Sequence, residues 1–329
     1  MVFRQSFRQI LILIVSCTII SSKAHLQQPG EWQALPYDIR SYDDVIRSLY
    51  QQVAQAQLQD LPDRITYFSA AFLGKPYELG ALGEGTTGQY NQNPWYRTDR
   101  FDCLTYVTTV LALVKGHTLE DFRYYMANIQ YKSGQIDFFQ RHHFISLDWN
   151  IENQRQGFVK SIVREITNQA GWPIYKTART YINKRAWYQY KSFSDLKILK
   201  SISLKEAQQL LQKLKTIGAT QKNAYSEIDY LPLNQLFDRE GKPNFYLFSQ
   251  IPNGAIIQII RPDWRVEKKI GTRLNVSHMG FVIYTPVGIM FREASRTKGE
   301  VSDTPLIDYL REYLNSSTVK GIHVLVIQK

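Results

Sequence analysis

The sequence predicts an α+β fold in which helices come first and antiparallel strands follow. In residues 42–58 and 103–116, apolar side chains recur every three to four positions, which is the spacing of helices packed on one side. Residues 255–260, 276–284 and 289–295 are short apolar runs bounded by turn residues, as expected for strands. Helices grouped before strands, rather than alternating with them, indicate an α+β arrangement.

The N-terminus has the features of an export signal. Two arginines precede an apolar run over residues 10–20, which is too short to cross a bilayer because a spanning helix needs about 20 residues. The small residues of Ser22-Lys23-Ala24 predict cleavage after residue 24, so that a signal peptide over 1–24 precedes a single domain over 25–329. The alternative is a lipoprotein anchored at Cys17. The apolar run continues past this cysteine, which favours cleavage and release into the periplasm.

The composition describes a basic, aromatic-rich globular chain. The net charge is +11, and 13% of the residues are aromatic, which argues against disorder. An exported protein does not meet nucleic acid, so the charge favours anionic envelope material such as lipid head groups or cell-wall peptide carboxylates. The alternative is a basic composition with no specific partner. No apolar segment after the signal is long enough to span a membrane.

The rest of the chain divides into a polar loop, further helices and an uninformative middle. Residues 74–95 are rich in glycine and must form a loop in which the backbone passes close to something. Residues 150–250 are expected to form an insertion or small subdomain. Additional helices are expected over 118–131, 204–214 and 306–314, and a closing strand over 321–327.

Cys103 is the only cysteine that remains after signal cleavage, so it has no partner for an intramolecular disulfide. It follows Asp102 and opens a helical pattern. Free N–H groups and the helix dipole lower the pKa of a thiol at such a position, which makes a thiolate nucleophile. The alternative is a small apolar residue that is buried for packing.

A thiolate nucleophile needs a histidine base that a third polar group orients. His278 opens a predicted strand, with Gly280 leaving room beside it, and Glu293 on the next strand can reach the imidazole. The adjacent histidines at 142 and 143 suggest a metal site, but side chains of neighbouring strand residues point in opposite directions. Because no spaced Cys or His-Glu-x-x-His motif is present, we expect neither a metal nor another cofactor.

Several segments resemble known cell-wall enzymes. The segments GKPYELG (74–80), FDCLTYV (101–107), NVSHMGFVIY (275–284) and FREAS (291–295) resemble the NlpC-type papain-like cell-wall peptidases. Two longer blocks, over 130–149 and 304–327, resemble the N-acetylmuramoyl-L-alanine amidase-like family, once known only as a domain of unknown function. The resemblance covers roughly residues 40–329 and implies a papain-like fold, with the nucleophile at a helix start packed on an antiparallel sheet.

The resemblance also implies residue roles. Cys103 corresponds to the nucleophile, His278 to the general base and Tyr77 to a tyrosine near the oxyanion. Glu293 stands where the superfamily usually has His, Asn or Gln, so its role departs from the common pattern. The family's own block implies four residues that line the substrate groove: Arg141, His143, Asp148 and Trp149.

The function expected from these patterns is a periplasmic cysteine amidase of peptidoglycan fragments. The family resemblance implies cleavage of the bond between N-acetylmuramic acid and L-alanine. The first alternative is the D-γ-glutamyl–diaminopimelate bond, which most of the wider superfamily cuts. Two others are a non-catalytic wall-binding module on the same scaffold and an acyltransferase that uses the same nucleophile. The exact bond, the sugar requirement and the oligomeric state do not follow from the sequence.

Overall fold

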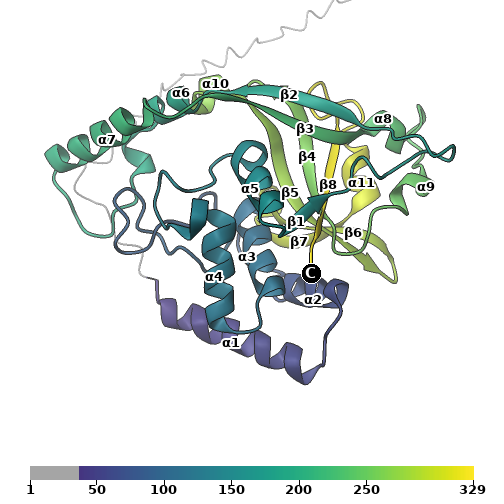
Figure 1. The fold of residues 1–329 in the computed structure, drawn as a ribbon, viewed down its shortest axis with the longest axis horizontal. Helices are drawn as coiled ribbons and strands as arrows, with labels where there is room; N and C mark the ends of the chain where they lie inside the picture. Colours follow the sequence, from purple (N-terminus) through teal and green to yellow (C-terminus); the bar gives the residue numbers. More distant parts are fainter. Residues whose placement is uncertain (1–36) are drawn as a thin grey trace, which may run out of the picture.

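The computed structural model describes residues 37–329, so the expected signal peptide and Cys17 lie outside the described residues. The chain begins with helices that lie beside an antiparallel sheet built mostly from the C-terminal half (Figure 1). This confirms the mixed α+β arrangement. The four leading helices are α1 (Ile39–Gln55), α2 (Leu61–Ala70), α3 (Cys103–Lys115) and α4 (Leu119–Gln130). None of the described helices is both long and apolar enough to cross a membrane.

The sheet has eight strands in the order β2-β3-β8-β4-β5-β6-β7, and β1 pairs with β8 beside this path. All of these strand pairs are antiparallel. The strands are β1 (Val159–Ser161), β2 (Lys176–Ile182), β3 (Ala224–Pro232), β4 (Ile256–Trp264), β5 (Leu274–Thr285), β6 (Gly288–Ser295), β7 (Glu300–Pro305) and β8 (Gly321–Ile327).

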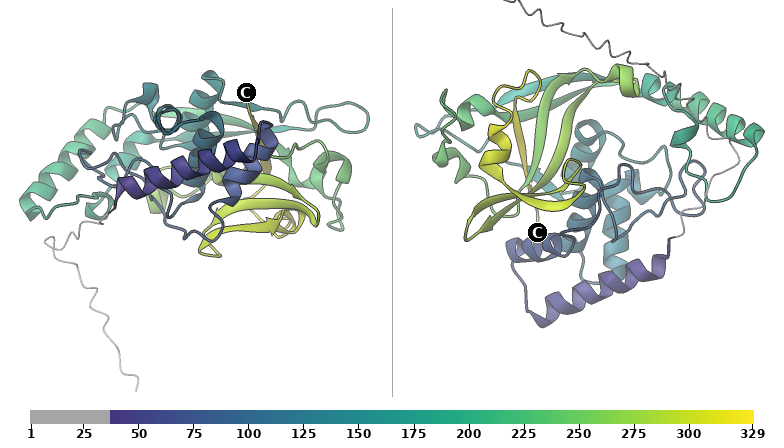
Figure 2. Two further views of the ribbon diagram at one scale, coloured as in Figure 1. Left: turned by 90° about the horizontal axis from the view of Figure 1, so that it is seen from below. Right: turned by 180° about the vertical axis from the view of Figure 1, so that it is seen from behind.

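Shorter helices connect these elements. They are α5 (Asn150–Arg155), α6 (Lys184–Gln189), α7 (Leu204–Gly218), α8 (Leu233–Leu236), α9 (Phe245–Phe248), α10 (Glu267–Ile270) and α11 (Leu306–Arg311). The 3₁₀ turns η1 (Lys132–Gly134) and η3 (Phe193–Asp195) and the π-helical turn η2 (Ile145–Trp149) complete the set. Figure 2 shows α1 running along the outside of the helical layer and α11 against the opposite side of the sheet.

The central strands are apolar on both faces because each face covers a separate core. Ile256 pairs with Phe281 and Leu325, and all three pack in the core shared with α1 to α4. The next residue of β4, Ile257, pairs with Val324, and both pack in the second core with α8, α9 and α11. Successive strand residues point to opposite faces, so continuous apolar runs are what a sheet covered on both sides requires.

Helix α3 is buried on nearly all sides, although its sequence predicts a single apolar stripe. Every residue from Thr105 to Val114 is buried, because α2, α4 and the sheet surround the helix. Threonines in this segment are tolerated where they find polar partners. Thr108, for example, accepts a hydrogen bond of 3.1 Å from the indole Nε1 of Trp149.

Strand β4 continues past its expected end. Proline removes a ladder donor, so the sequence predicts that the strand stops before Pro262. The structure carries β4 on to Trp264, with register shifts against β5 and with Asp263 at a φ of 53°. The pairing with β8 ends at Ile260 opposite Gly321. At Pro262 there is therefore no β8 carbonyl to which a backbone N–H would have to donate a hydrogen bond.

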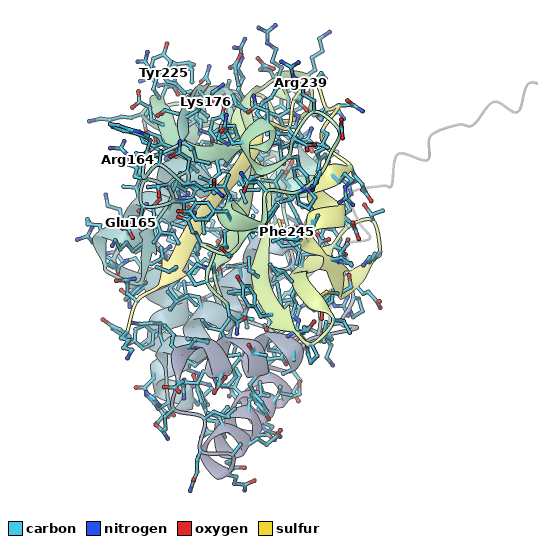
Figure 3. All side chains as sticks on the ribbon, turned by 90° about the vertical axis from the view of Figure 1, so that its right-hand side faces the viewer. Arg164, Glu165, Lys176, Tyr225, Arg239 and Phe245 are labelled. Carbon is cyan, nitrogen blue, oxygen red and sulfur yellow. The ribbon has the colours of Figure 1, made fainter. Side chains whose placement is uncertain are left out.

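The stretch 150–250 forms part of the sheet and also forms helices outside it. Strands β1, β2 and β3 come from this stretch, and residues of β2, β3 and α9 such as Lys176, Tyr225 and Phe245 lie on the side of the molecule seen in Figure 3. Between β2 and β3 the chain forms α6, η3 and α7. These pack in a small third core in which Tyr188 and Leu214 meet Tyr90 and Phe138 from earlier segments.

Candidate active site

Cys103 is the first residue of α3 and is partly exposed. Asp102 caps the helix: its carboxylate accepts a hydrogen bond of 2.8 Å from the Thr105 N–H, and the Thr105 hydroxyl accepts one of 2.8 Å from the Asp102 N–H. This reciprocal capping fixes the first turn of α3. The thiol therefore lies at the N-terminus of the helix, where the free N–H groups and the helix dipole create a positive potential.

The second oxygen of Asp102 ties the glycine-rich segment to the helix start. It accepts a hydrogen bond of 2.9 Å from the Gly80 N–H. The segment then folds back on itself, with the Glu84 N–H donating to the Asn91 carbonyl at 2.8 Å. Gly83 has no room for a side chain because a Cβ would lie 2.4 Å from Oδ1 of Asn91. The expected close backbone approach therefore occurs at Gly83, whereas a Cβ at Gly80 would meet nothing within 4 Å.

His278 and Glu293 meet on neighbouring strands. Phe281 on β5 pairs with Arg292 on β6, and Nε2 of His278 hydrogen-bonds Oε2 of Glu293. Gly280 makes this arrangement possible, because a Cβ there would lie 2.6 Å from the Arg292 carbonyl oxygen and 2.8 Å from the Phe291 ring. The Phe291 ring instead packs edge-on against the imidazole, with ring centroids 5.8 Å apart.

The Cys103 side chain lies close enough to the His278 ring for its charge to raise the pKa of the imidazole. Since Glu293 occupies Nε2, the other ring nitrogen, Nδ1, is the one available to the thiol. Burial alone lowers the pKa of His278, but the negative charges of Cys103 and Glu293 and their hydrogen bonds raise it to about 10. The imidazole is therefore protonated at neutral pH when it faces a thiolate, and it can give that proton to a leaving group.

Tyr77 and Tyr309 add hydroxyl groups around the thiol. Burial, together with the negative charges of Cys103 and Asp102, raises the pKa of Tyr77 to about 12. Burial and then the charges of Glu293, Tyr313 and Cys103 raise the pKa of Tyr309. Both phenols stay protonated at neutral pH and can donate hydrogen bonds. The sequence analysis did not single out Tyr309, which lies in one of the two family-like blocks.

A cavity of about 550 Å³ adjoins Cys103 on the side of its neighbours Asp102 and Leu104. It is lined in part by Gly80, Trp187 and Lys191. The Lys191 ammonium lies 3.8 Å from the centroid of the Trp187 ring. This combination of aromatic faces and hydrogen-bonding groups can hold a polar, ring-shaped ligand. Neither Trp187 nor Lys191 was predicted, because both come from the uninformative stretch between β2 and β3.

Arg141 and Trp149 border this cavity from within the protein. The Arg141 guanidinium forms a buried ion pair of 2.5 Å with Glu84, and Nη1 donates to the Leu82 carbonyl at 3.0 Å. Burial raises the pKa of Glu84 to about 7 against the opposing charge of Arg141. Trp149 is only 1% exposed and donates to Thr108, so the main contribution of its ring is to the core.

His143 and Asp148 are also engaged within the protein. The His143 Nε2 lies 2.7 Å from the Phe138 carbonyl, and burial followed by the charge of Arg141 lowers the pKa of His143 well below 6.5. Asp148 pairs with Lys184 at 2.5 Å. His143 lines the cavity, whereas Asp148 is not among the residues that do. The structure therefore brings Cys103, His278, Glu293 and Tyr77 together. Of the four predicted groove residues, Arg141, His143 and Trp149 line the cavity and Asp148 does not.

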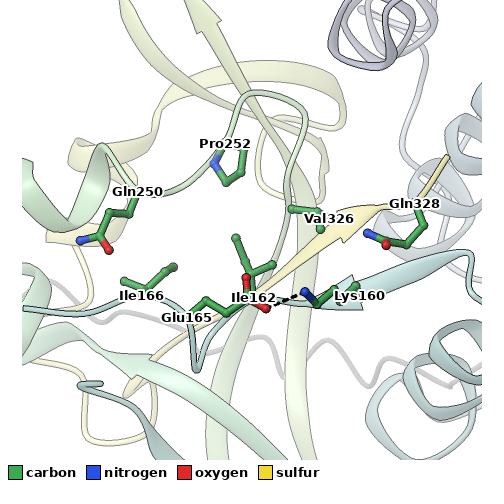
Figure 4. A pocket seen from close by; sticks show the side chains of 8 residues that line it. All are labelled: Lys160, Ile162, Glu165, Ile166, Gln250, Pro252, Val326 and Gln328. Carbon is green, nitrogen blue, oxygen red and sulfur yellow. Dashed lines mark ion pairs between the residues drawn. The ribbon is translucent and has the colours of Figure 1, made fainter. Parts of the chain in front are cut away.

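Two further cavities were not expected from the sequence. One of about 300 Å³ is lined by His278, Glu293 and Arg261 among others. Another, of about 500 Å³, includes Lys160 and Glu165, which form an ion pair of 2.7 Å (Figure 4). The cavity in Figure 4 shares no lining residue with the two beside Cys103 and contains neither cysteine nor histidine. Within residues 37–329, no group of three or more metal-ligating side chains occurs.

The fold and this cluster define a mixed α+β protein with a cysteine–histidine–glutamate site at a helix start. Residues 67–317 match the AmiA-like family, described as N-acetylmuramoyl-L-alanine amidase-like, and the chain belongs to this family. A crystal structure of a Legionella pneumophila protein, classed as a domain of unknown function, is 41% identical, with a TM-score of 0.85 over 88% of this chain and 96% of that chain.

A more distant solved structure is an N-acetylmuramoyl-L-alanine amidase from Bacteroides uniformis. It is 23% identical, with a TM-score of 0.54 over 82% of this chain and 99% of that chain, and at this identity the likeness concerns the fold. No curated protein gave a significant match. The family identifies the chain as amidase-like and connects it with peptidoglycan.

Replacing Asp102 by Ala tests the link between the helix start and the glycine-rich segment. We expect the free energy of unfolding to fall by about 0.5–2 kcal/mol, the usual cost of a lost N-terminal cap, and amide hydrogen exchange over residues 74–95 to accelerate. Ser203→Ala is the matched control, because Ser203 forms the same type of capping box with Glu206 on α7. It should cost similar stability and leave exchange over 74–95 unchanged. Equal exchange in both variants would contradict the link.

Proposed function

We propose that this protein is a cysteine amidase of peptidoglycan fragments and cleaves the bond between N-acetylmuramic acid and L-alanine. The observation that supports this best is the cluster of Cys103, His278 and Glu293, with the cysteine at a helix N-terminus and the histidine between the other two. A helix start, an imidazole and an orienting carboxylate are the three requirements of a thiolate nucleophile. The arrangement also supports assignment to the NlpC-type papain-like superfamily.

In the proposed reaction the Cys103 thiolate attacks the lactyl carbonyl carbon of the muramic acid, and a tetrahedral oxyanion forms. The Cys103 N–H and the Tyr77 hydroxyl donate hydrogen bonds to this oxygen. His278 gives its proton to the leaving nitrogen, the C–N bond breaks, and the peptide departs with a free amine. An acyl thioester remains on Cys103.

Deacylation follows with the same groups. Water enters the place of the departed amine, His278 accepts a proton from it, and the resulting hydroxide attacks the thioester carbonyl. Collapse of the second oxyanion breaks the C–S bond, releases the carboxylic acid of the sugar, which loses its proton to solvent, and restores the Cys103 thiolate beside protonated His278. Glu293 holds the imidazole in one orientation through both half-reactions and stabilises its positive charge.

The family membership supports the muramoyl–alanine bond, while the D-γ-glutamyl–diaminopimelate bond is the alternative for the same machinery. A non-catalytic wall-binding role is the second alternative. We also propose that the protein acts in the periplasm, where its substrate is found. The expected signal peptide supports that location.

Digestion of purified disaccharide–tetrapeptide with the full chain tests the bond. We expect mass spectrometry to detect the intact disaccharide and the free tetrapeptide, whereas a released dipeptide would indicate the D-γ-glutamyl–diaminopimelate bond. Cys103→Ala should lower kcat by at least about 1,000-fold, since it removes the nucleophile. Unchanged activity of Cys103→Ala would exclude the mechanism.

Alkylation by iodoacetamide at pH 6 separates an activated thiol from a passive one. We expect Cys103 to react at least about tenfold faster than a free thiol, because a free thiol with a pKa near 8.5 is almost fully protonated at this pH. His278→Ala should lower the rate toward that of a free thiol, while His117→Ala, at the exposed far end of α3, should not change it. A wild-type rate equal to that of a free thiol would favour the non-catalytic wall-binding role.

The pH dependence of kcat/KM reports the proton on His278. The pKa of His278 is raised to about 10, so the proton donor is present throughout the neutral range and is lost as the pH rises through about 10. We expect kcat/KM to decline on that alkaline limb. Glu293→Gln removes one of the charges that raise the pKa, so the decline should begin at lower pH. An alkaline limb that does not move in Glu293→Gln would show that Glu293 does not support the charge of His278.

A further inference from the structure

The cavity of about 300 Å³ beside His278 has three cationic side chains among the residues that line it: Arg261, Arg296 and Lys298. Arg261 comes from the irregular end of β4, and the other two come from the turn between β6 and β7. Nothing in the proposed chemistry requires these charges. Because these charges lie next to the imidazole, we looked for a ligand group that they could bind.

Arg261 is held in place by neutral partners. Its Nε donates to the Ser277 hydroxyl at 3.1 Å, and its Nη1 donates to the Thr318 hydroxyl at 2.6 Å. The guanidinium also lies 5.0 Å from the centroid of the Trp264 ring. Hydroxyl and aromatic partners orient a guanidinium without neutralising it, so its charge stays available to an anion.

The nearby aspartates are already paired with other arginines. Asp263 pairs with Arg273 at 2.8 Å, and Asp303 pairs with Arg292 at 2.8 Å. Lys298 donates to the Asp303 carbonyl and to the Thr304 hydroxyl, both neutral acceptors. Within residues 37–329, none of the three cations of the cavity takes part in an ion pair.

Two carboxylates also line the cavity, and they do not cancel its charge. Glu293 is committed to His278. Glu312 lies on the exposed rim and faces solvent. Protonated His278 offsets Glu293, so one rim glutamate stands against three cations. The balance favours an anionic ligand group that contacts Arg261.

The direction of the proposed reaction decides which part of the substrate reaches this cavity. His278 gives its proton to the leaving nitrogen, so the leaving group must lie on the side of the imidazole. We therefore assign the larger cavity, which is lined by Asp102 and Leu104, to the acyl part of the substrate. We propose that the cavity beside His278 is a carboxylate-binding subsite for the leaving peptide, with Arg261 as its main ligand. This inference rests on the proposed function for its orientation.

A peptide with a free side-chain or α-carboxylate within a few atoms of its amino end fits this subsite, and a neutral peptide does not. Arg261 supplies a planar guanidinium whose geometry matches a carboxylate. Trp264, Tyr309 and Tyr313 provide walls for the peptide backbone. Arg296 lies near enough to Tyr77 for its charge to lower the pKa of that phenol against the larger effect of burial.

The test compares a muropeptide whose peptide carboxylates are free with one in which they are primary amides. We expect Arg261→Gln to lower kcat/KM for the free-acid substrate by about tenfold or more, mainly through KM, since a charge-assisted hydrogen bond contributes about that much. For the amidated substrate kcat/KM should change by less than about twofold. Arg239→Gln, which removes the same charge at an exposed residue that does not line the cavity (labelled in Figure 3), should affect neither substrate.

Arg296→Gln provides a second variant. The Arg296 side chain is exposed, so we expect this variant to fold normally. It should reduce the preference for the free acid in the same direction and by less. An equal loss for both substrates in Arg261→Gln would overturn the subsite, because it would show damage to the fold or to His278. A wild-type enzyme that prefers the amidated substrate would also overturn it.

Calorimetry separates the subsite from the proposed function. The full chain carrying Cys103→Ala is titrated with the free tetrapeptide and with its amidated form, neither of which needs to be cleaved. Tighter binding of the acidic peptide, lost in the double variant with Arg261→Gln, supports the subsite even if no muropeptide is hydrolysed. Cleavage by the wild type with equal binding of both peptides would keep the function and reject the subsite.

Discussion

The structure around the site depends on the carboxylate of Asp102. One oxygen closes the first turn of α3 and the other holds Gly80, so a single side chain fixes both the start of the helix and the loop beside it. A thiol gains its reactivity from a helix start only if that start is rigid, because the N–H groups act over one turn. The cap and the loop together supply this rigidity, and the threonine at position 105 completes it.

The second constraint is the pairing of β5 with β6. His278 lies two residues before Gly280, on the same face of β5, and Glu293 belongs to the neighbouring strand at that level. A long side chain can bridge such a diagonal pair. Gly280 leaves room for the Phe291 ring to pack edge-on against the imidazole. Glu293 and Cys103 are then the polar neighbours of the imidazole. Orientation of the base thus comes from the sheet, and its charge comes from its partners.

Much of this could be predicted from local sequence. The helix start at Cys103, the hairpin of β5 and β6 and the capping box of α7 follow from signals a few residues long. The long-range features could not be predicted. The burial of α3 on all sides depends on elements far away in the chain, and the extension of β4 through Pro262 depends on where β8 ends. The cations of the smaller cavity come from segments that share no local motif.

The two cavities beside Cys103 differ in charge, which suits a substrate with a sugar at one end and a peptide at the other. The larger one offers aromatic faces, and two of its cations are paired, Arg141 with Glu84 and Lys191 with Asp195. The smaller one offers cations whose partners are hydroxyls and a ring. A buried ion pair shapes a wall without attracting charge, whereas an unpaired guanidinium selects an anion. If the nucleophile lies between an aromatic-lined sugar site and a cationic site for a peptide carboxylate, this asymmetry fixes the direction in which a muropeptide binds, and with it the bond presented to Cys103.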